Sequence, residues 1–115
     1  MQRYHIIIDI TGISHEKLTD TKGIEELLNT LPGKIGMNIL VKPKVVEGIP
    51  ANPGITGYVI IDFSHISVHT FTDKDLAMVD VFSCKPYDQS VATDYVLQFF
   101  GVDKSHAFIK EVFWG

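Results

Sequence analysis

The sequence predicts an α+β fold, in which an antiparallel sheet of about four to six strands carries two main helices on one face. Three β-rich runs follow one another between residues 56 and 84 with no helical pattern between them, as is typical of antiparallel strands joined by turns. Two other segments, residues 22–31 and 88–100, repeat their apolar residues at helical spacing. With 115 residues, the chain is long enough for one domain, which we expect to cover residues 1–115.

The first strand and the first helix are expected near the N-terminus. Residues 4–11 are rich in β-branched side chains and predict a strand. Residues 22–31 predict an amphipathic helix that is capped by Thr21 and ends at Pro32 and Gly33. Four aliphatic residues would form its buried stripe: Ile24, Leu27, Leu28 and Leu31.

The middle of the chain predicts four strands. Residues 37–47 predict a strand at a sheet edge or a bulge, because Pro43 has no N–H group for a central ladder. Residues 48–54 contain two prolines and two glycines and predict a loop. Three further strands are expected at residues 56–63, 65–70 and 77–84.

The C-terminal part predicts a second helix and a last strand. Asp88 is the expected N-cap of a helix over residues 88–100, and Gly101 is suited to the position just after its end. Residues 106–113 predict the final strand. The expected order is therefore β-α-β-β-β-β-α-β.

The composition is ordinary for a soluble globular protein, with 45% hydrophobic and 21% charged residues. A formal net charge of -4 without a clustered basic stripe argues against nucleic acid as a partner. The single cysteine, Cys84, cannot form an internal disulfide, so we expect an intracellular protein. No stretch approaches the roughly 20 apolar residues of a membrane span. We therefore expect a cytoplasmic location and no membrane partner.

Polar and reactive side chains gather along residues 64–69. Every second residue from His65 to His69 is polar, and Ile66 and Val68 alternate with them, so one face of the predicted strand is polar. This face is either simply solvated or part of a reactive site. His65 and His69 would lie about 13 Å apart along a strand, too far for one metal ion to bind both, so no metal site is expected.

The residues between 54 and 84 form a longer pattern. A β-rich run leads into a Ser-His pair, then a short apolar–polar alternation, a His-Thr-aromatic triplet, and a strand that ends in cysteine. The residues concerned are Ser64, His65, His69, Thr70, Phe71 and Cys84. The pattern resembles the bacterial and archaeal S-adenosylmethionine decarboxylase proenzymes, whose opening strand is also similar to the segment from His5 to Asp9.

The resemblance implies an enzyme that makes its own cofactor. The Ser64 hydroxyl would attack the preceding carbonyl, the chain would break at Phe63–Ser64, and a pyruvoyl group would remain on the new N-terminus. That ketone would form a Schiff base with the substrate amine and act as an electron sink for decarboxylation, without a metal. The implied function is decarboxylation of S-adenosylmethionine for polyamine (spermidine) synthesis.

The same resemblance implies roles for individual residues. His69 would handle protons during processing, with Thr56 in the position of a serine that assists it. Apart from the resemblance, His65 and His69 are both close enough to Ser64 in sequence to be candidate bases. Cys84 would be the general acid that reprotonates the carbon after CO2 leaves. Substrate contacts are implied for Asp73, Phe71 and Asp9, although Asp73 is equally consistent with a plain turn residue and Phe71 with simple packing. The family also implies a homodimer; a monomeric ferredoxin-like domain is the alternative.

Three positions depart from the family pattern. Phe63 stands where a glutamate normally precedes the cleaved serine, and Thr56 stands where the family has serine. Ile49 and Pro50 occupy the region where an aromatic residue would stack on adenine. Two alternative functions therefore stay open: a relative that does not process itself and binds a small ligand or partner, and a decarboxylase of another amino acid such as arginine or ornithine.

Overall fold

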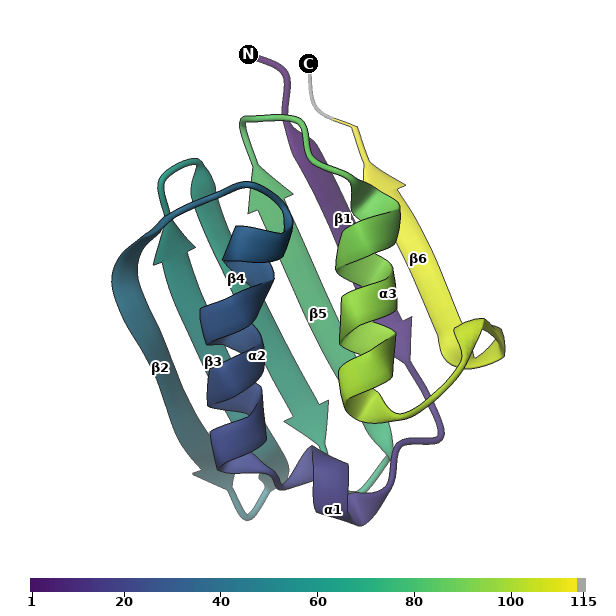
Figure 1. The fold of residues 1–115 in the computed structure, drawn as a ribbon. Helices are drawn as coiled ribbons and strands as arrows, with labels where there is room; N and C mark the ends of the chain where they lie inside the picture. Colours follow the sequence, from purple (N-terminus) through teal and green to yellow (C-terminus); the bar gives the residue numbers. More distant parts are fainter. Residues whose placement is uncertain (114–115) are drawn as a thin grey trace.

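A computed structural model describes residues 1–113 and contains a six-stranded antiparallel sheet with the strand order β2-β3-β4-β5-β1-β6 (Figure 1). The strands are β1 (Tyr4–Ile10), β2 (Ile39–Ile49), β3 (Asn52–Ile61), β4 (Ser64–Phe71), β5 (Leu76–Ser83) and β6 (Ala107–Val112). The helices are α1 (His15–Leu18), α2 (Thr21–Lys34), α3 (Gln89–Phe100) and a 3-10 turn, η1 (Lys104–His106). The α+β prediction and the expected order of the main elements are confirmed.

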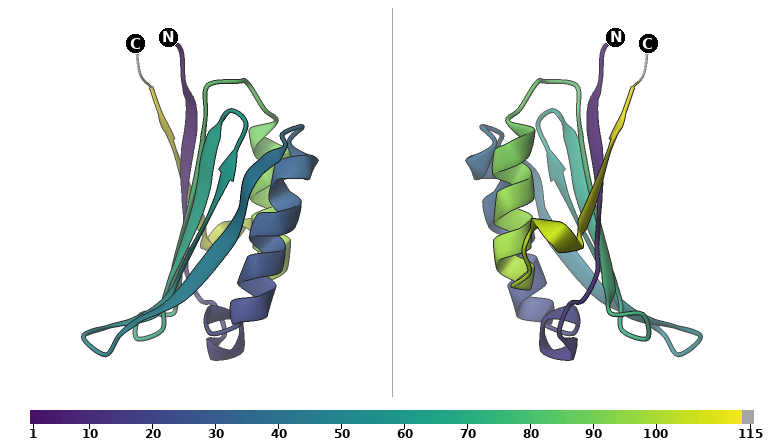
Figure 2. Two further views of the ribbon diagram at one scale, coloured as in Figure 1. Left: turned by 90° about the vertical axis from the view of Figure 1, so that its left-hand side faces the viewer. Right: turned by 90° about the vertical axis from the view of Figure 1, so that its right-hand side faces the viewer.

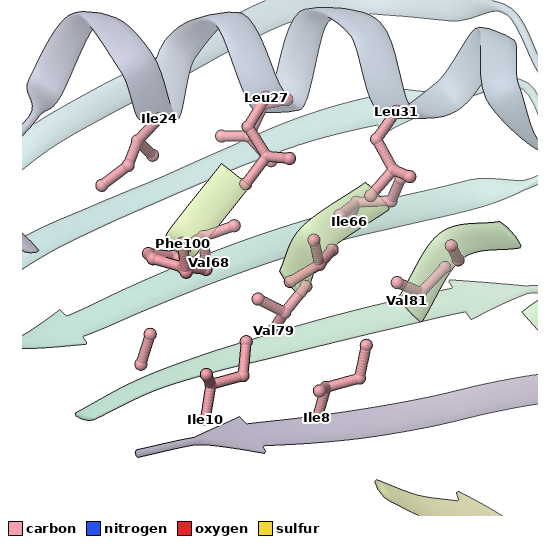
Figure 3. Packing of buried hydrophobic residues seen from close by; sticks show 14 of the residues in the cluster. Ile8, Ile10, Ile24, Leu27, Leu31, Ile66, Val68, Val79, Val81 and Phe100 are labelled. Carbon is pink, nitrogen blue, oxygen red and sulfur yellow. The ribbon is translucent and has the colours of Figure 1, made fainter. Parts of the chain in front are cut away.

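Helices α2 and α3 pack side by side on one face of the sheet, and no helix formed by residues 1–113 covers the opposite face (Figure 2). The core lies between these two layers, where Leu27 and Leu31 of α2 and Phe100 of α3 meet Ile66 and Val79 of the sheet (Figure 3). We call the helix-free side the open face. The side chains that alternate with the core residues define it: Thr56, Tyr58, Ile60, His65, Ser67, His69, Met78, Asp80, Phe82, His5, Ile7 and Asp9.

The limits of α2 differ from those predicted. Asp20, rather than Thr21, is the N-cap, because its Oδ1 accepts a hydrogen bond from the Gly23 N–H at 2.9 Å. The helix does not stop at Pro32 but continues to Lys34. A proline in the last turn removes only one helical hydrogen bond, and its ring is buried here, so the chain can remain helical to its end.

The caps of α3 agree with the prediction. Asp88 is the N-cap, and its Oδ1 accepts hydrogen bonds from the N–H groups of Ser90 (3.0 Å) and Val91 (3.2 Å). Gly101 follows the helix with φ 72°, a left-handed conformation that glycine adopts without strain. None of the helices within residues 1–113 combines the length and apolar character needed to cross a bilayer.

The predicted loop over residues 48–54 is wrong, because β2 and β3 form a hairpin that leaves only Pro50 and Ala51 between the strands. Gly54 permits the close approach of β3 to β4: a Cβ atom there would lie 1.8 Å from the Thr70 carbonyl oxygen. The edge position expected from Pro43 is confirmed, since β2 is an outer strand and its register with β3 shifts between Val41 and Lys44.

The short helix α1 has no counterpart in the prediction. Ser14 caps it, and the buried hydroxyl of Thr70 joins it to the sheet. Thr70 Oγ1 donates to the Leu18 carbonyl at 2.7 Å and accepts from the Ile55 N–H at 2.9 Å. One side chain therefore links α1, β3 and β4.

Candidate active site

Ser64 is the first residue of β4 and follows a two-residue turn made of Asp62 and Phe63. The Phe63–Ser64 bond therefore lies where a hairpin turn enters β4. Ser64 has φ 145°, a value that L-residues rarely adopt. Such backbone strain, on the order of 1–3 kcal/mol, persists only where neighbouring contacts enforce it.

Cys84 is brought to the same end of the sheet. Its neighbour Ser83 pairs with Ser64 across β4 and β5, and the Cys84 side chain is exposed. The Cys84 N–H donates to the Phe63 carbonyl oxygen at 2.9 Å. The structure thus places the Cys84 backbone directly on the carbonyl that Ser64 would attack.

Asn38 and Lys85 also contact this turn, and no local pattern in the sequence points to either residue. The Asn38 side chain donates from Nδ2 to Asp62 Oδ2 at 3.0 Å, and this hydrogen bond holds the pKa of the Asp62 carboxyl below its ordinary value. The Lys85 ammonium lies 4.9 Å from the centre of the Phe63 ring. Both contacts join segments far apart in the chain, so only the folded structure reveals them.

His69 and Thr56 form a second cluster, at a distance from Ser64. Thr56 Oγ1 and His69 Nδ1 lie 3.0 Å apart on the open face, where the two residues are direct cross-strand neighbours. His69 lies five positions after Ser64 along β4, which amounts to about 17 Å at the usual strand rise. Within one chain, the structure does not bring the predicted proton carrier to the predicted cleavage site.

His65 follows Ser64 directly, but its ring is stacked on Phe82, with centroids 5.4 Å apart. On the other side of Phe82 lies His5, whose Nε2 is 2.9 Å from Asp80 Oδ2. This His5–Asp80 pair was not found from the sequence, because the two residues lie on different strands. Asp9 lies on the open face as well, and its Oδ1 is buried without a hydrogen-bond partner.

The remaining predicted residues lie at the His69 end of the sheet. Phe71 ends β4, and Asp73 is exposed in the turn that follows. Close by is a hollow of about 340 Å³ between α1, the β2–β3 hairpin and Thr72, and its lining includes Ile49 and Pro50. Among residues 1–113, no three His, Cys, Asp or Glu side chains converge in the way that a metal site requires.

Comparison with known proteins identifies the family to which these clusters belong. The model of the S-adenosylmethionine decarboxylase family matches residues 4–110. The chain belongs to the S-adenosylmethionine decarboxylase family.

Relatives of this family extend over most of the chain. The S-adenosylmethionine decarboxylase proenzyme of Geobacillus kaustophilus is 33% identical over 97 residues, which cover 84% of this chain and 76% of that protein. That of Pyrococcus furiosus is 34% identical over 104 residues, 90% of this chain and 73% of that protein. The crystal structure of the adenosylmethionine decarboxylase from Aquifex aeolicus superimposes with a TM-score of 0.80 at 27% identity, covering 99% of this chain and 91% of that one.

The structure shows where this member of the S-adenosylmethionine decarboxylase family departs from the family's sequence pattern. Phe63 lies in the hairpin turn and packs partly against the core. Thr56 keeps a hydroxyl within hydrogen-bond distance of His69. Ile49 and Pro50 border the hollow at the opposite end of the sheet, and its lining among residues 1–113 contains no Phe, Tyr or Trp.

Proposed function

We propose that the chain is a pyruvoyl-dependent S-adenosylmethionine decarboxylase that cleaves itself between Phe63 and Ser64 and serves polyamine (spermidine) synthesis. Its relatives are named S-adenosylmethionine decarboxylase proenzymes, which supports both the substrate and the need for processing. The observation that carries the proposal is Ser64 itself. It combines a hydroxyl, a strained φ of 145° and a preceding carbonyl that is held by the Cys84 N–H.

Self-cleavage follows from these groups in balanced steps. The Ser64 Oγ bonds to the Phe63 carbonyl carbon and gives its proton to a base; the C–N bond then breaks and the nitrogen takes up a proton. The product is an ester between Phe63 and the Ser64 Oγ. Loss of the Ser64 Cα proton breaks the Cβ–Oγ bond and releases a Phe63 carboxylate. This leaves a double bond between Cα and Cβ, and Cβ takes up a proton so that the enamine becomes an imine. Water then adds to the imine carbon, the nitrogen leaves as ammonia, and the ketone of a pyruvoyl group remains.

The residues around Ser64 fit such a group, because Ser64 begins a strand at the end of the sheet, and Cys84, whose N–H contacts the Phe63 carbonyl, is exposed. The pyruvoyl group supplies an electron sink for loss of CO2 from an amino acid. The Cys84 thiol, as general acid, would return a proton to the carbon that loses CO2. Thr56, through its contact with His69, would orient that ring for proton transfer during processing.

The separation of the two clusters supports a homodimer. The open face carries half-exposed apolar side chains such as Tyr58 (41%) and Ile60 (39%), which a second sheet would cover. If the open faces of two protomers are related by a twofold axis that runs between the sheets and across their strands, β4 of one protomer is antiparallel to β4 of the other. This arrangement would then bring His69 and Thr56 of one protomer over the Ser64 end of its partner. We propose that each site is shared in this way.

Such a dimer also gives a place for the substrate. Phe71 at the end of β4 and Asp73 in the turn after it lie beyond His69, so they would reach the partner's Ser64 end together with His69. We propose that the Asp73 carboxylate accepts hydrogen bonds from the ribose hydroxyls, that Phe71 packs on the base and that Asp9 faces the substrate amine. The small-molecule substrate would then lie between the two protomers.

Mass spectrometry of the intact, freshly purified protein tests the central step. Cleavage gives a fragment of residues 1–63 and a fragment of residues 64–115 that is blocked to Edman chemistry, whereas Ser64→Ala stays whole. Release of labelled CO2 from carboxyl-labelled S-adenosylmethionine, arginine and ornithine then identifies the substrate.

A second candidate function is binding without catalysis, and the specific observation that favours it is Phe63, which removes a carboxylate from the residue before Ser64. A wild-type chain that stays whole after long incubation and releases no CO2 from any of the three substrates would establish this alternative. Release from arginine or ornithine alone would keep the chemistry and change the substrate.

A further inference from the structure

The turn that carries the Phe63–Ser64 bond is held by groups from outside its hairpin. Asp62 and Asn38 exchange three hydrogen bonds: the Asp62 N–H donates to the Asn38 carbonyl oxygen at 2.9 Å, the Asn38 N–H donates to Asp62 Oδ1 at 3.1 Å, and Asn38 Nδ2 donates to Asp62 Oδ2 at 3.0 Å. Asn38 precedes β2 and is far from the hairpin in sequence. The first residue of the turn is therefore fixed on both its backbone and its side chain.

The second residue of the turn is held from the opposite side, by the segment that follows β5. The Cys84 N–H donates to the Phe63 carbonyl oxygen at 2.9 Å, and the Lys85 ammonium lies 4.9 Å from the Phe63 ring centre. The buried Ser83 hydroxyl donates to the Lys85 carbonyl at 2.8 Å and accepts from the Lys85 N–H at 2.9 Å. This local bend fixes the direction in which the Cys84 N–H points.

Lys85 also connects the two supports. Its Nζ donates to the Gly36 carbonyl oxygen at 3.0 Å, two residues before Asn38. The segments before β2 and after β5 thus form one frame around the turn, and in Figure 1 both lie at the end of the sheet where β3 turns into β4. Such a frame can impose the φ of 145° that Ser64 would not adopt on its own.

We propose that the Asn38–Asp62 pair is a positioning clamp for self-cleavage, and that the Cys84 backbone N–H polarises the Phe63 carbonyl. The proposal rests on the proposed function, namely that the Ser64 hydroxyl attacks this carbonyl. When the Oγ–C bond forms, the carbonyl electron pair moves onto the oxygen, and a donor already in place stabilises the charge without reorganisation. Asp62 and Asn38 act through the turn rather than on the reacting atoms, so they are positioning residues.

The clamp gives the Asp62 carboxylate a role different from that of a catalytic glutamate. Both of its oxygens are engaged by Asn38, so it anchors the turn instead of accepting the Ser64 proton. This chain has Phe63 where the family usually has glutamate. The carboxylate of Asp62 lies one residue earlier and is paired with Asn38.

A swap of the two side chains provides the test. Asp62→Asn places two amides face to face and Asn38→Asp places two carboxylates face to face, whereas the double variant restores one donor opposite one acceptor. Each single variant should slow cleavage roughly 10- to 100-fold, because small misplacements of reacting groups have effects of this size. The double variant should recover most of the rate. Asp103→Ala is the matched control, since Asp103 also accepts a turn N–H (Ser105, 2.9 Å) but lies outside the frame.

Hydroxylamine makes the readout specific, because it cleaves the ester and so reports the acyl shift apart from the later elimination. Fragment yield against time, with and without hydroxylamine, is measured by mass spectrometry, and unfolding in a Ser64→Ala background shows that each variant is folded. If the wild-type chain cleaves itself and both single variants cleave at the same rate as the wild type, the clamp is overturned but self-processing is not. A wild-type chain that is cut neither spontaneously nor by hydroxylamine overturns self-processing, and the clamp with it.

Discussion

At the scale of single residues, Ser64 combines a nucleophilic hydroxyl with a backbone conformation that favours glycine. Substitution can therefore separate the chemical effect of the Ser64 hydroxyl from the effect of the strained backbone on stability. Ser64→Ala removes the hydroxyl and keeps the Cβ atom, and Ser64→Gly removes both. Neither variant can form the ester, so their stabilities compare two uncleaved chains.

Ser64→Gly should be more stable than Ser64→Ala by about 1 kcal/mol. Release of the backbone strain contributes about 1–3 kcal/mol, and the greater freedom of glycine in the unfolded chain offsets about 0.5–1 kcal/mol of it. Urea unfolding of the two purified variants measures the difference. An alanine variant as stable as the glycine variant would mean that Ser64 is not strained.

At the scale of elements, the strands were largely predictable because alternation is a local property. In β4 and β5 every second side chain is buried, and the structure confirms both predicted strands to within a residue or two. Helix α1 has only four residues, too few for a helical period, and was missed. The prolines and glycines of residues 48–54 are compatible with a loop as well as with the tight β2–β3 hairpin, so they do not distinguish the two.

The site was only partly predictable for the same reason. Ser64, Phe63 and Cys84 do meet, although their cluster depends on the register between β4 and β5. His69 is close to Ser64 in sequence, but the extended backbone of β4 puts about 17 Å between the two residues. Asn38, Lys85 and the His5–Asp80 pair are contacts between distant segments, for which a single sequence holds no signal.

Thr70 offers a test of how the elements are joined. Thr70→Val keeps the shape but leaves the Ile55 N–H and the Leu18 carbonyl buried without their partner, which should cost about 1–3 kcal/mol. Thr30→Val is the matched control, because the Thr30 hydroxyl makes an exposed hydrogen bond to Glu26 within α2, and it should change stability by less than about 0.5 kcal/mol. Both are measured by urea unfolding in the Ser64→Ala background. Equal effects in the two variants would show that Thr70 does not join α1 to the sheet.

At the scale of the whole molecule, the proposed dimer determines which chain supplies which group. Ser64→Ala keeps His69, and His69→Ala keeps Ser64, so neither homodimer would hold a complete site. A mixed dimer would hold one, in which Ser64 of the His69→Ala chain faces the partner's intact His69. The shared site therefore predicts cleavage only after the two variants are combined.

Co-expression of the two variants in equal amounts should lead to cleavage of about half of the His69→Ala chains, the share expected in mixed dimers if pairing is random. The Ser64→Ala chains should stay whole. Tags of different mass distinguish the chains in the spectrometer, and light scattering confirms the dimer. If His69→Ala is cut equally well alone, each chain completes its own site.

The position of β1 in the sheet means that self-cleavage would change how the molecule refolds. β1 comes from the segment before residue 63, yet it lies between β5 and β6, which come from the segment after it (Figure 1). A cut at Phe63–Ser64 would therefore leave two interleaved peptides that share the hydrogen bonds of β3–β4, β5–β1 and β1–β6. The uncut chain folds at a rate independent of its concentration, but two separated peptides must first collide. A cut and unfolded molecule would therefore refold more slowly the more dilute the two peptides are. The refolding rate would thus differ between a chain that has been cut and one that has not.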